Sequence, residues 1–236
     1  HLEKEMVSQP PGRKNKVTQF FEGILRRLLS LAVSAAGMIL LCPIYLAIAI
    51  LIKRDSPGPV IHKESRVGRR GRVFKIRKFR TTSADEPDAG SAAAGMSQSE
   101  RRETAFGRFL RETKLDEIPQ LWNVFIGDLN LVGPRAEDPR TVAEWPEEIC
   151  REILSVRPGL TGPASVLYTY FDNLLQSQNV IERSLFDFLP TRLRLDQLYV
   201  RRRSWLTDLD VLSWTALSLL PRLRFVPFPE ALHPSG

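Results

Sequence analysis

The sequence predicts a mainly helical α+β protein in which a broken membrane helix is followed by a small soluble domain. Three observations support this fold class. An uncharged apolar run covers residues 28–52, a proline interrupts this run at position 43, and residues 60–79 alternate between apolar and polar as in a β-hairpin. The 236 residues are enough for one domain of ordinary size with an appended membrane element.

The membrane run is unusual because it contains Cys42-Pro43. A proline inside a helix removes a backbone hydrogen bond and kinks or breaks the helix. The run thus divides into arms of about 21 Å and about 14 Å at ~1.5 Å per residue, and neither is expected to cross a hydrocarbon core of ~30 Å alone. Positive residues stand at both ends of the run, so charge gives no direction for a crossing. A re-entrant helix and a kinked spanning helix both fit, and hydropathy favours the kinked spanning helix.

Positive charge is concentrated in the segment that follows. Residues 63–80 contain nine Lys or Arg and one Glu, a net charge of +8, while the whole chain carries +7. Two apolar-polar stretches around the glycine-flanked loop VGRRG predict a β-hairpin with mostly basic exposed residues. Such a patch requires an acidic partner, which charge alone leaves open between nucleic acid, anionic lipid and a phosphorylated small molecule.

Two adjacent acids, Asp116 and Glu117, lie in the stretch KLDEIPQLW. A helix is predicted over about residues 100–112, and Pro119, which is tolerated in a first helical turn, indicates that a new helix begins near Asp116. Backbone amides point outward at a helix N-terminus, so the pair is well placed for a phosphate or a metal. The alternative is that the acids only complement the helix dipole, for about 0.3–1 kcal/mol.

Other segments give weaker signals. The loops at 127–139 and 157–164 are rich in glycine and proline, and each carries an arginine that could bind a phosphate, although ordinary turns have the same composition. Trp205 and Trp214 beside the basic triplet 201–203 favour helices on a membrane surface, or else the tryptophans are core residues. Two cysteines and three widely separated histidines argue against a disulfide framework and a histidine-based metal site. No P-loop or dinucleotide fingerprint is present.

Taken together, the ordered segments resemble the bacterial sugar transferase family of monotopic phosphoglycosyl transferases. The resemblance covers roughly residues 24–212 and rests on PGPVIHKESRVGRRGRVFKIRKFRT, GRFLRETKLDEIPQLWNVFIGDLNLVGPR, RPGLTG, LDQLYV and WLTDLDVL. It implies a re-entrant membrane helix with its bend at Cys42-Pro43, where the family more often has serine before the proline. It therefore reverses the preference that hydropathy gives.

The resemblance also implies the site. It assigns Asp116 as the nucleophile and Glu117 as its catalytic partner, with Mg²⁺ bound by both acids. Arg111 matches a phosphate-binding arginine of the family and Asp196 matches a further functional acid, whose role stays open. On motif position and charge, we expect further phosphate contacts from Lys78, Arg80 and Arg135.

The implied reaction transfers a phosphosugar from a UDP-sugar to polyprenol phosphate through an aspartyl-phosphosugar intermediate. It releases UMP and starts glycoconjugate or exopolysaccharide assembly. The implied partners are the nucleotide-sugar donor, polyprenol phosphate and membrane lipids. No binding of nucleic acid is expected, and a homodimer is compatible with the resemblance. The implied location is the bacterial inner membrane, with the catalytic domain on the cytoplasmic face.

The resemblance divides the chain into four parts: a lead-in tail at 1–23, the re-entrant helix-break-helix at 24–54, a cytosolic catalytic domain at 55–200, and membrane-surface helices with a tail at 201–236. The sequence departs from the family pattern at Thr82, Ala136 and residues 163–165, positions that we connect with the choice of nucleotide or sugar.

A competing interpretation is a membrane-anchored binding protein that uses residues 63–80 for nucleic acid or anionic lipid. Charge alone would then give its affinity a steep salt dependence.

Overall fold

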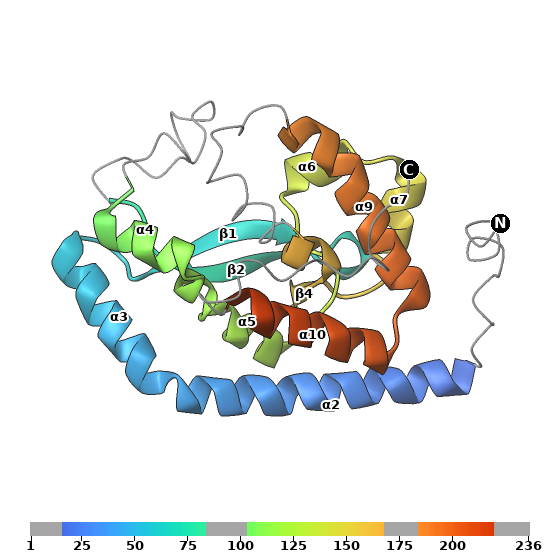
Figure 1. The fold of residues 1–236 in the computed structure, drawn as a ribbon, viewed down its shortest axis with the longest axis horizontal. Helices are drawn as coiled ribbons and strands as arrows, with labels where there is room; N and C mark the ends of the chain where they lie inside the picture. The colour runs from blue at the N-terminus through green and yellow to red at the C-terminus, as the bar shows by residue number, and fades with distance from the viewer. Residues whose placement is uncertain (1–15, 84–102, 168–183, 220–236) are drawn as a thin grey trace.

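A computed structural model describes residues 16–83, 103–167 and 184–219 of the chain (Figure 1). Its helices are α2 (Lys16–Leu40), α3 (Cys42–Asp55), α4 (Ala105–Glu112), α5 (Gln120–Ile126), α6 (Pro139–Ala143), α7 (Glu147–Ile153), α9 (Ser184–Arg202) and α10 (Trp205–Leu219). Its strands are β1 (Ile61–Val67), β2 (Val73–Phe79), β3 (Asn130–Val132) and β4 (Gly159–Thr161), and its 3₁₀ turns are η1 (Arg69–Gly71) and η3 (Leu115–Glu117). The prediction of a mainly helical α+β protein is confirmed.

The break in the apolar segment lies where the sequence places it. α2 ends at Leu40 and α3 begins at Cys42, with Pro43 in the first turn of α3. Pro43 has no backbone N–H to continue the ladder of α2, and a first helical turn is where a proline is tolerated. Figure 1 shows that α3 leaves the axis of α2 at this point and turns toward α4.

The first arm is longer than expected, which corrects one prediction. α2 has 25 residues, and its segment Phe21–Leu40 is long and apolar enough to cross a membrane by length and composition. Arg26 and Arg27 lie inside this helix, since arginine is a good helix former, and both guanidinium groups have partners within the protein. Arg27 donates to the carbonyl oxygens of Val124 and Phe125 in α5, at 2.6 and 2.7 Å.

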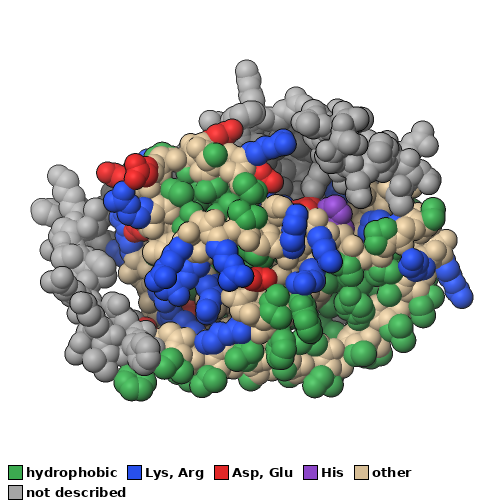
Figure 2. Space-filling view, turned by 180° about the vertical axis from the view of Figure 1, so that it is seen from behind, with side chains coloured by type: hydrophobic (Ala, Val, Ile, Leu, Met, Phe, Trp, Pro, Cys, Tyr) green, Lys and Arg blue, Asp and Glu red, His purple; other side chains and the backbone are tan. Residues whose placement is uncertain are grey.

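Apolar side chains are exposed along α2 and α3, most strongly at the break. The exposed fractions of Ile39 and Leu40 are 78% and 76%, whereas a large apolar side chain in a protein core is nearly fully buried. Figure 2 shows hydrophobic side chains along this edge of the molecule, with Lys and Arg side chains gathered next to them. An apolar surface of this extent marks a site of contact with a membrane or a partner.

The basic segment forms the predicted hairpin. β1 and β2 pair antiparallel, with Ile61 opposite Phe79 and Val67 opposite Val73. Alternation along the strands separates two faces. One face buries Phe74 and Ile76, whereas the other face and the turn expose the following basic residues: Lys63, Arg69, Arg70, Arg72 and Lys75.

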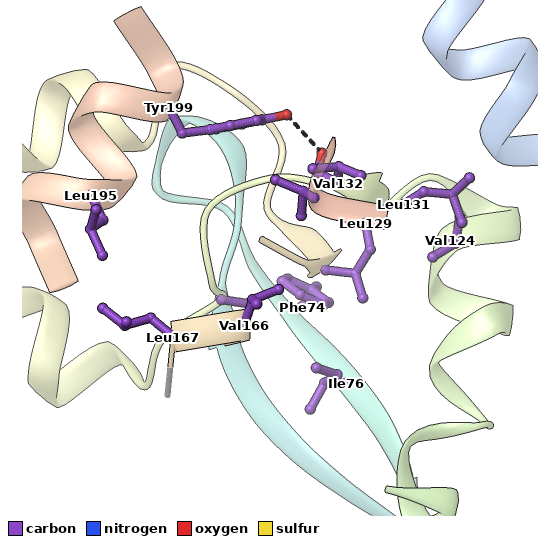
Figure 3. Close-up of a cluster of buried hydrophobic side chains, with 12 residues drawn as sticks. Phe74, Ile76, Val124, Leu129, Leu131, Val132, Val166, Leu167, Leu195 and Tyr199 are labelled. Carbon is purple, nitrogen blue, oxygen red and sulfur yellow. Dashed lines mark hydrogen bonds between the residues drawn. The ribbon is translucent and has the colours of Figure 1, made fainter. Parts of the chain in front are cut away.

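The main core lies between β2, the short parallel pair β3–β4 and the C-terminal helices. Figure 3 shows Phe74 of β2 between Leu129 and Val166, with Tyr199 of α9 reaching toward β3. The hydroxyl of Tyr199 donates to the carbonyl oxygen of Val132 at 3.3 Å. β3 and β4 are held together by packing on this core, because a pair of three-residue strands is too short to be stable alone.

Helix boundaries differ from the expected ones in three places. α4 begins at Ala105, because Thr104 caps it by accepting from the N–H of Gly107 at 2.9 Å. The expected domain borders at 23/24 and 200/201 both fall inside continuous helices, α2 and α9.

In α10, Trp205 is 57% exposed while Trp214 packs against the core, so each tryptophan follows a different one of the two interpretations.

Candidate active site

The acid pair lies in a tight turn between α4 and α5. Lys114 adopts a left-handed conformation (φ 59°), and η3 then carries Asp116 and Glu117. Pro119 directly precedes the first residue of α5. The prediction of a new helix that begins near Asp116 is wrong in its start, because α5 begins at Gln120 and the acids lie in the 3₁₀ turn before it.

Asp116 is buried, and its Oδ1 has no hydrogen-bond partner among the described residues. Burial, together with the neighbouring Glu117, raises the pKa of Asp116 to about 6. Desolvation and a nearby like charge both disfavour a carboxylate, which explains the direction. A buried carboxylate with a free oxygen is costly unless a ligand satisfies it, so Asp116 is a candidate for function rather than for stability.

Three cations partly offset this cost. Lys78, Lys114 and Arg111 each act to lower the pKa of Asp116. The Nζ of Lys78, on β2, lies 3.5 Å from Oε1 of Glu117. The structure therefore brings together four of the predicted residues around one turn: Lys78, Arg111, Asp116 and Glu117.

Arg111 is half-exposed at the end of α4. Its Nη2 donates to Oγ1 of Thr81 at 3.0 Å, and its Nε lies 3.2 Å from Oε1 of Glu103. Both partners are partly buried, whereas the side chain of Arg111 itself is 48% exposed, and an ion pair with an exposed member contributes little to stability. Arg111 is thus available to exchange Glu103 for a phosphate.

Arg80 has a different environment from the one expected. Its guanidinium donates to the carbonyl oxygens of Pro57 and Ser56, at 2.6 and 2.7 Å, and to Oγ of Ser56 at 2.9 Å. These groups lie at the end of α3, where unpaired carbonyls accept readily from a cation. Arg80 therefore connects the hairpin to the end of α3, and its contact with phosphate stays a prediction.

Arg135 lies in a loop whose glycines permit close backbone packing. An added Cβ at Gly159 would lie 2.1 Å from the backbone N of Gly133, and one at Gly162 would lie 2.1 Å from its carbonyl O. Only glycine allows two backbones to approach in this way. The two glycine-rich loops of the sequence thus pack on each other, and Arg135 extends from this contact.

Asp196 lies deep in the protein, beside the Arg135 loop. Burial raises its pKa to about 7, although Arg192, the backbone N–H of Arg135 and the charge of Arg135 act in the opposite direction. Arg192 itself pairs with Glu137. Asp196 is therefore close to Arg135, its Oδ1 has no hydrogen-bond partner among the described residues, and its role in the site stays a prediction.

Two cavities border Glu117. The first, of about 300 Å³, extends from Lys114 and Glu117 to Leu41 at the helix break. The second, of about 20 Å³, is lined by Glu117 together with three basic residues, Arg66, Lys78 and Arg135. Asp116 is not among the lining residues of either cavity. The two cavities place positive charge next to the acid pair, as binding of a phosphorylated substrate requires.

Sequence reasoning missed several residues of this region. Asn123 is fully buried and joins α5 to β2, because its side chain accepts from the N–H of Arg77 at 3.0 Å and donates to the carbonyl oxygen of Lys75 at 2.8 Å. Its polar side chain interrupts the apolar stretch LWNVFI, and this was the available signal in the sequence. Thr161, Ser165 and Thr215 line the larger cavity, and no sequence pattern identified them.

The acids fit a magnesium ion in part. Mg²⁺ in phosphate-handling sites is commonly bound by one or two carboxylates together with substrate phosphates. Asp116 and Glu117 supply two carboxylates, and the free Oδ1 of Asp116 lacks a protein partner within the described ranges. In the same ranges, no group of three or more His, Cys, Asp or Glu residues is close enough to hold a metal. An ion at this pair would therefore take its other ligands from substrate or water.

Comparisons with known proteins agree with this arrangement. Residues 21–222 match the family described as bacterial sugar transferase. A UDP-N-acetylgalactosamine-undecaprenyl-phosphate N-acetylgalactosaminephosphotransferase of Aeromonas hydrophila is 34% identical over 180 residues, which cover 75% of this chain and 42% of the relative. A UDP-glucose:undecaprenyl-phosphate glucose-1-phosphate transferase of Caulobacter vibrioides is 36% identical over 201 residues, which cover 83% and 69%.

A third relative comes from Rhizobium leguminosarum bv. phaseoli. This exopolysaccharide production protein PSS is 38% identical over 148 residues, which cover 61% of this chain and 74% of the relative. The chain thus spans less than half of the Aeromonas relative and about seven tenths of the other two. The resemblance inferred from the sequence motifs is confirmed at the level of the family.

Proposed function

The chain belongs to the bacterial sugar transferase family, and on this premise we propose that it transfers a phosphosugar from a UDP-sugar to polyprenol phosphate. The names of the relatives supply the donor and acceptor classes. The observation that supports this function within the structure is the buried Asp116, which has a free oxygen and lies beside Glu117 and three cations. The products are UMP and a polyprenyl diphosphate sugar.

The first step is a displacement at phosphorus by Asp116. A carboxylate oxygen of Asp116 forms a bond to the phosphorus that carries the sugar, and the bond between this phosphorus and the bridging oxygen breaks. UMP leaves with the electron pair, and the sugar phosphate stays on Asp116 as an acyl phosphate. Because Asp116 is buried without substrates, donor binding has to expose its carboxylate.

The second step regenerates the enzyme. A phosphate oxygen of polyprenol phosphate attacks the same phosphorus, and the bond from that phosphorus to Asp116 breaks. The electron pair returns to Asp116, so the carboxylate is restored and the diphosphate linkage of the product is formed. Dividing one displacement into two in this way is the general advantage of a covalent nucleophile.

Cations around the pair compensate the repulsion between the carboxylate and the substrate phosphates. Lys78, Lys114 and Arg111 already act on Asp116, and Arg135 lines both cavities at Glu117. Fixed positive charge stabilises the charge that develops on the transferring phosphoryl group. Glu117 assists either as an acid/base group or as a metal ligand.

Mg²⁺ is the proposed cofactor, held by Asp116 and Glu117. When bound, a divalent ion neutralises phosphate charge and polarises a phosphoryl oxygen. The side chains described above keep their roles with the ion present: Asp116 is the nucleophile, and Lys78 and Arg111 hold the negative charge of the donor.

The exposed apolar edge of α2 and α3 is the proposed membrane contact. We infer that this segment enters the bilayer and returns at the bend at Cys42-Pro43, so that the domain beyond α3 lies on the cytoplasmic face of the inner membrane. The exposed apolar residues at the bend, Ile39 and Leu40, support immersion of this part. The proposed pathway role is the start of glycoconjugate or exopolysaccharide assembly.

The proposed function is tested by the mass of the intact protein. Detergent-purified protein is incubated with Mg²⁺ and either UDP-glucose or UDP-N-acetylgalactosamine, without a lipid acceptor. We expect a mass increase equal to one phosphosugar, absent in Asp116→Asn and retained in Asp210→Asn, an exposed acid on α10. An adduct that persists in Asp116→Asn would remove Asp116 as the nucleophile.

A membrane-anchored binding protein is the second candidate, because the outer face of the hairpin exposes Lys63, Lys75 and the basic turn. This function predicts that the affinity for anionic lipid or nucleic acid falls steeply with salt concentration and does not change when Asp116 is substituted. Turnover that depends on Asp116 would exclude it as the main activity.

A further inference from the structure

The cavity of about 300 Å³ has two chemically different ends. Lys114, Glu117 and Arg135 stand at one end, where two cations and one acid border the catalytic turn. Most of the other lining side chains are apolar, namely Leu41, Ile118, Leu121, Leu131, Leu160, Val166 and Leu212, and four carry hydroxyl groups, namely Thr161, Ser165, Thr215 and Ser218. A ligand that fits both ends has an anionic head and an apolar chain.

The apolar lining of the cavity includes a residue at the helix break, where the most exposed apolar side chains lie. Leu41 lies between α2 and α3 and lines the cavity. The two residues before it, Ile39 and Leu40, are the most exposed large apolar side chains among the described residues. The lining of one cavity therefore includes both a residue next to the exposed helix break, Leu41, and Glu117 of the acid pair.

We propose that this cavity is the acceptor site, with the phosphate of polyprenol phosphate at Lys114 and Arg135 and its first isoprene units along Leu121 and Leu212. The inference rests on the proposed function, which supplies the acceptor class. The acceptor phosphate then lies beside Glu117, next to the residue that carries the sugar phosphate. α10, which the sequence predicted only as a membrane-surface helix, provides one wall through Leu212, Thr215 and Ser218.

A neighbouring groove of about 620 Å³ is the competing location. Met38, Tyr45 and Trp122 line it, and Lys63 and Arg77 are its cations. It shares Leu41, Ile118 and Leu121 with the first cavity, so these residues separate the two spaces. A lipid phosphate bound at Lys63 and Arg77 would lie in a groove that Glu117 does not line, and this disfavours the groove for the acceptor.

Half-reactions test the site. The protein is first loaded from the UDP-sugar without lipid, and undecaprenyl phosphate in detergent micelles is then added while the adduct is followed by mass spectrometry. Leu212→Trp fills the proposed cavity, whereas Met38→Trp fills only the neighbouring groove, so the two are matched variants. We expect Leu212→Trp to lose the adduct at least about tenfold more slowly than the unmodified chain, and Met38→Trp to lose it at the normal rate.

The outcomes separate the two proposals. Absence of an adduct in the unmodified chain contradicts the proposed function, while an adduct that Leu212→Trp releases at the normal rate overturns the acceptor site alone. Slow release in Met38→Trp instead would place the chain in the neighbouring groove and also overturn the site. If Leu212→Trp does not load, the unmodified chain is cross-linked with a polyprenyl phosphate that carries a diazirine near its phosphate. Labelled peptides from Trp205–Leu219 are expected, and labelling confined to Met38 and Trp122 would contradict the proposal.

Discussion

Lys78 and Glu117 form an ion pair with 3.5 Å between Nζ and Oε1, which connects β2 of the hairpin to the turn that carries the acid pair. Lys78 is also one of the cations that lower the pKa of Asp116. Lys78→Met should therefore slow formation of the phosphosugar adduct on the order of 10²-fold, the typical effect of removing one group that stabilises developing negative charge. Single-turnover mass spectrometry measures this rate.

Lys75→Met is the matched control, because Lys75 lies on the same strand but is exposed on the outer face, where its Nζ donates to Oγ of Ser65 at 2.8 Å. We expect its adduct to form at the normal rate. Equal losses in both variants would show that only the overall positive potential of the hairpin matters, and would remove Lys78 from the site.

Arg27 holds α2 against the element that follows the acid pair. Its guanidinium donates to the carbonyl oxygens of Val124 and Phe125, in the final turn of α5, at 2.6 and 2.7 Å. Hydrogen bonds from charged groups contribute about 1.5–3 kcal/mol each when buried, so for this partly exposed pair we expect Arg27→Met to cost about 2 kcal/mol. For a chain of this length, that corresponds to a fall in Tm of about 4–8 °C. Differential scanning fluorimetry in detergent measures the fall, and Lys53→Met, an exposed cation at the end of α3, should leave Tm unchanged.

Asn123 is the buried polar link between α5 and β2. Asn123→Ala leaves the N–H of Arg77 and the carbonyl oxygen of Lys75 without their side-chain partner. An unsatisfied buried group costs about 1–3 kcal/mol, so we expect a loss of about 3 kcal/mol in the free energy of unfolding. Asn123→Asp should be at least as costly, because the second carboxylate oxygen would then face the Lys75 carbonyl and Asp128. Thermal unfolding that leaves Asn123→Ala as stable as the unmodified chain would contradict this account.

The sequence predicted those features that depend on neighbouring residues. A helix begins close to each of two prolines, Pro43 and Pro119. The helix break and the place of the acid pair before a helix could therefore be inferred from neighbouring residues. The hairpin also follows from local order, because alternation at 73–79 and glycines at the turn specify strand, turn and strand.

Features that depend on distant residues could not be predicted. Arg27 donates to a carbonyl oxygen 97 positions later, so this charged residue lies inside α2 with a partner that no local pattern indicates. Arg80, directly after β2, lies against the end of α3, where the carbonyl oxygens of Ser56 and Pro57 accept from it. Leu212 lines the acceptor cavity only because α10 packs beside β3 and β4.

Asp196 should make stability depend on pH. Burial raises its pKa from 3.8 to about 7 against the opposing effect of Arg192 and Arg135. A carboxyl group whose pKa is raised by folding contributes stability that is present below pH 3.8 and is lost as the pH rises through about 7. We expect the difference in Tm between Asp196→Asn and the unmodified chain to increase across this range in favour of the variant. Asp210→Asn, an exposed acid, should show no such trend, and a constant difference for Asp196→Asn would show that folding does not raise the pKa of Asp196.

Magnesium should bind weakly without the donor and tightly with it. Within the described residues only two adjacent carboxylates are available to the ion, and no third His, Cys, Asp or Glu completes a cluster. Because Mg²⁺ prefers six oxygen ligands, substrate phosphates and water have to supply the rest. Isothermal titration with Mg²⁺ should therefore give at least about tenfold higher affinity in the presence of UMP, and Glu117→Gln should weaken binding in both conditions. Equal affinity with and without UMP would indicate that the protein alone completes the site, and would contradict the two-carboxylate account.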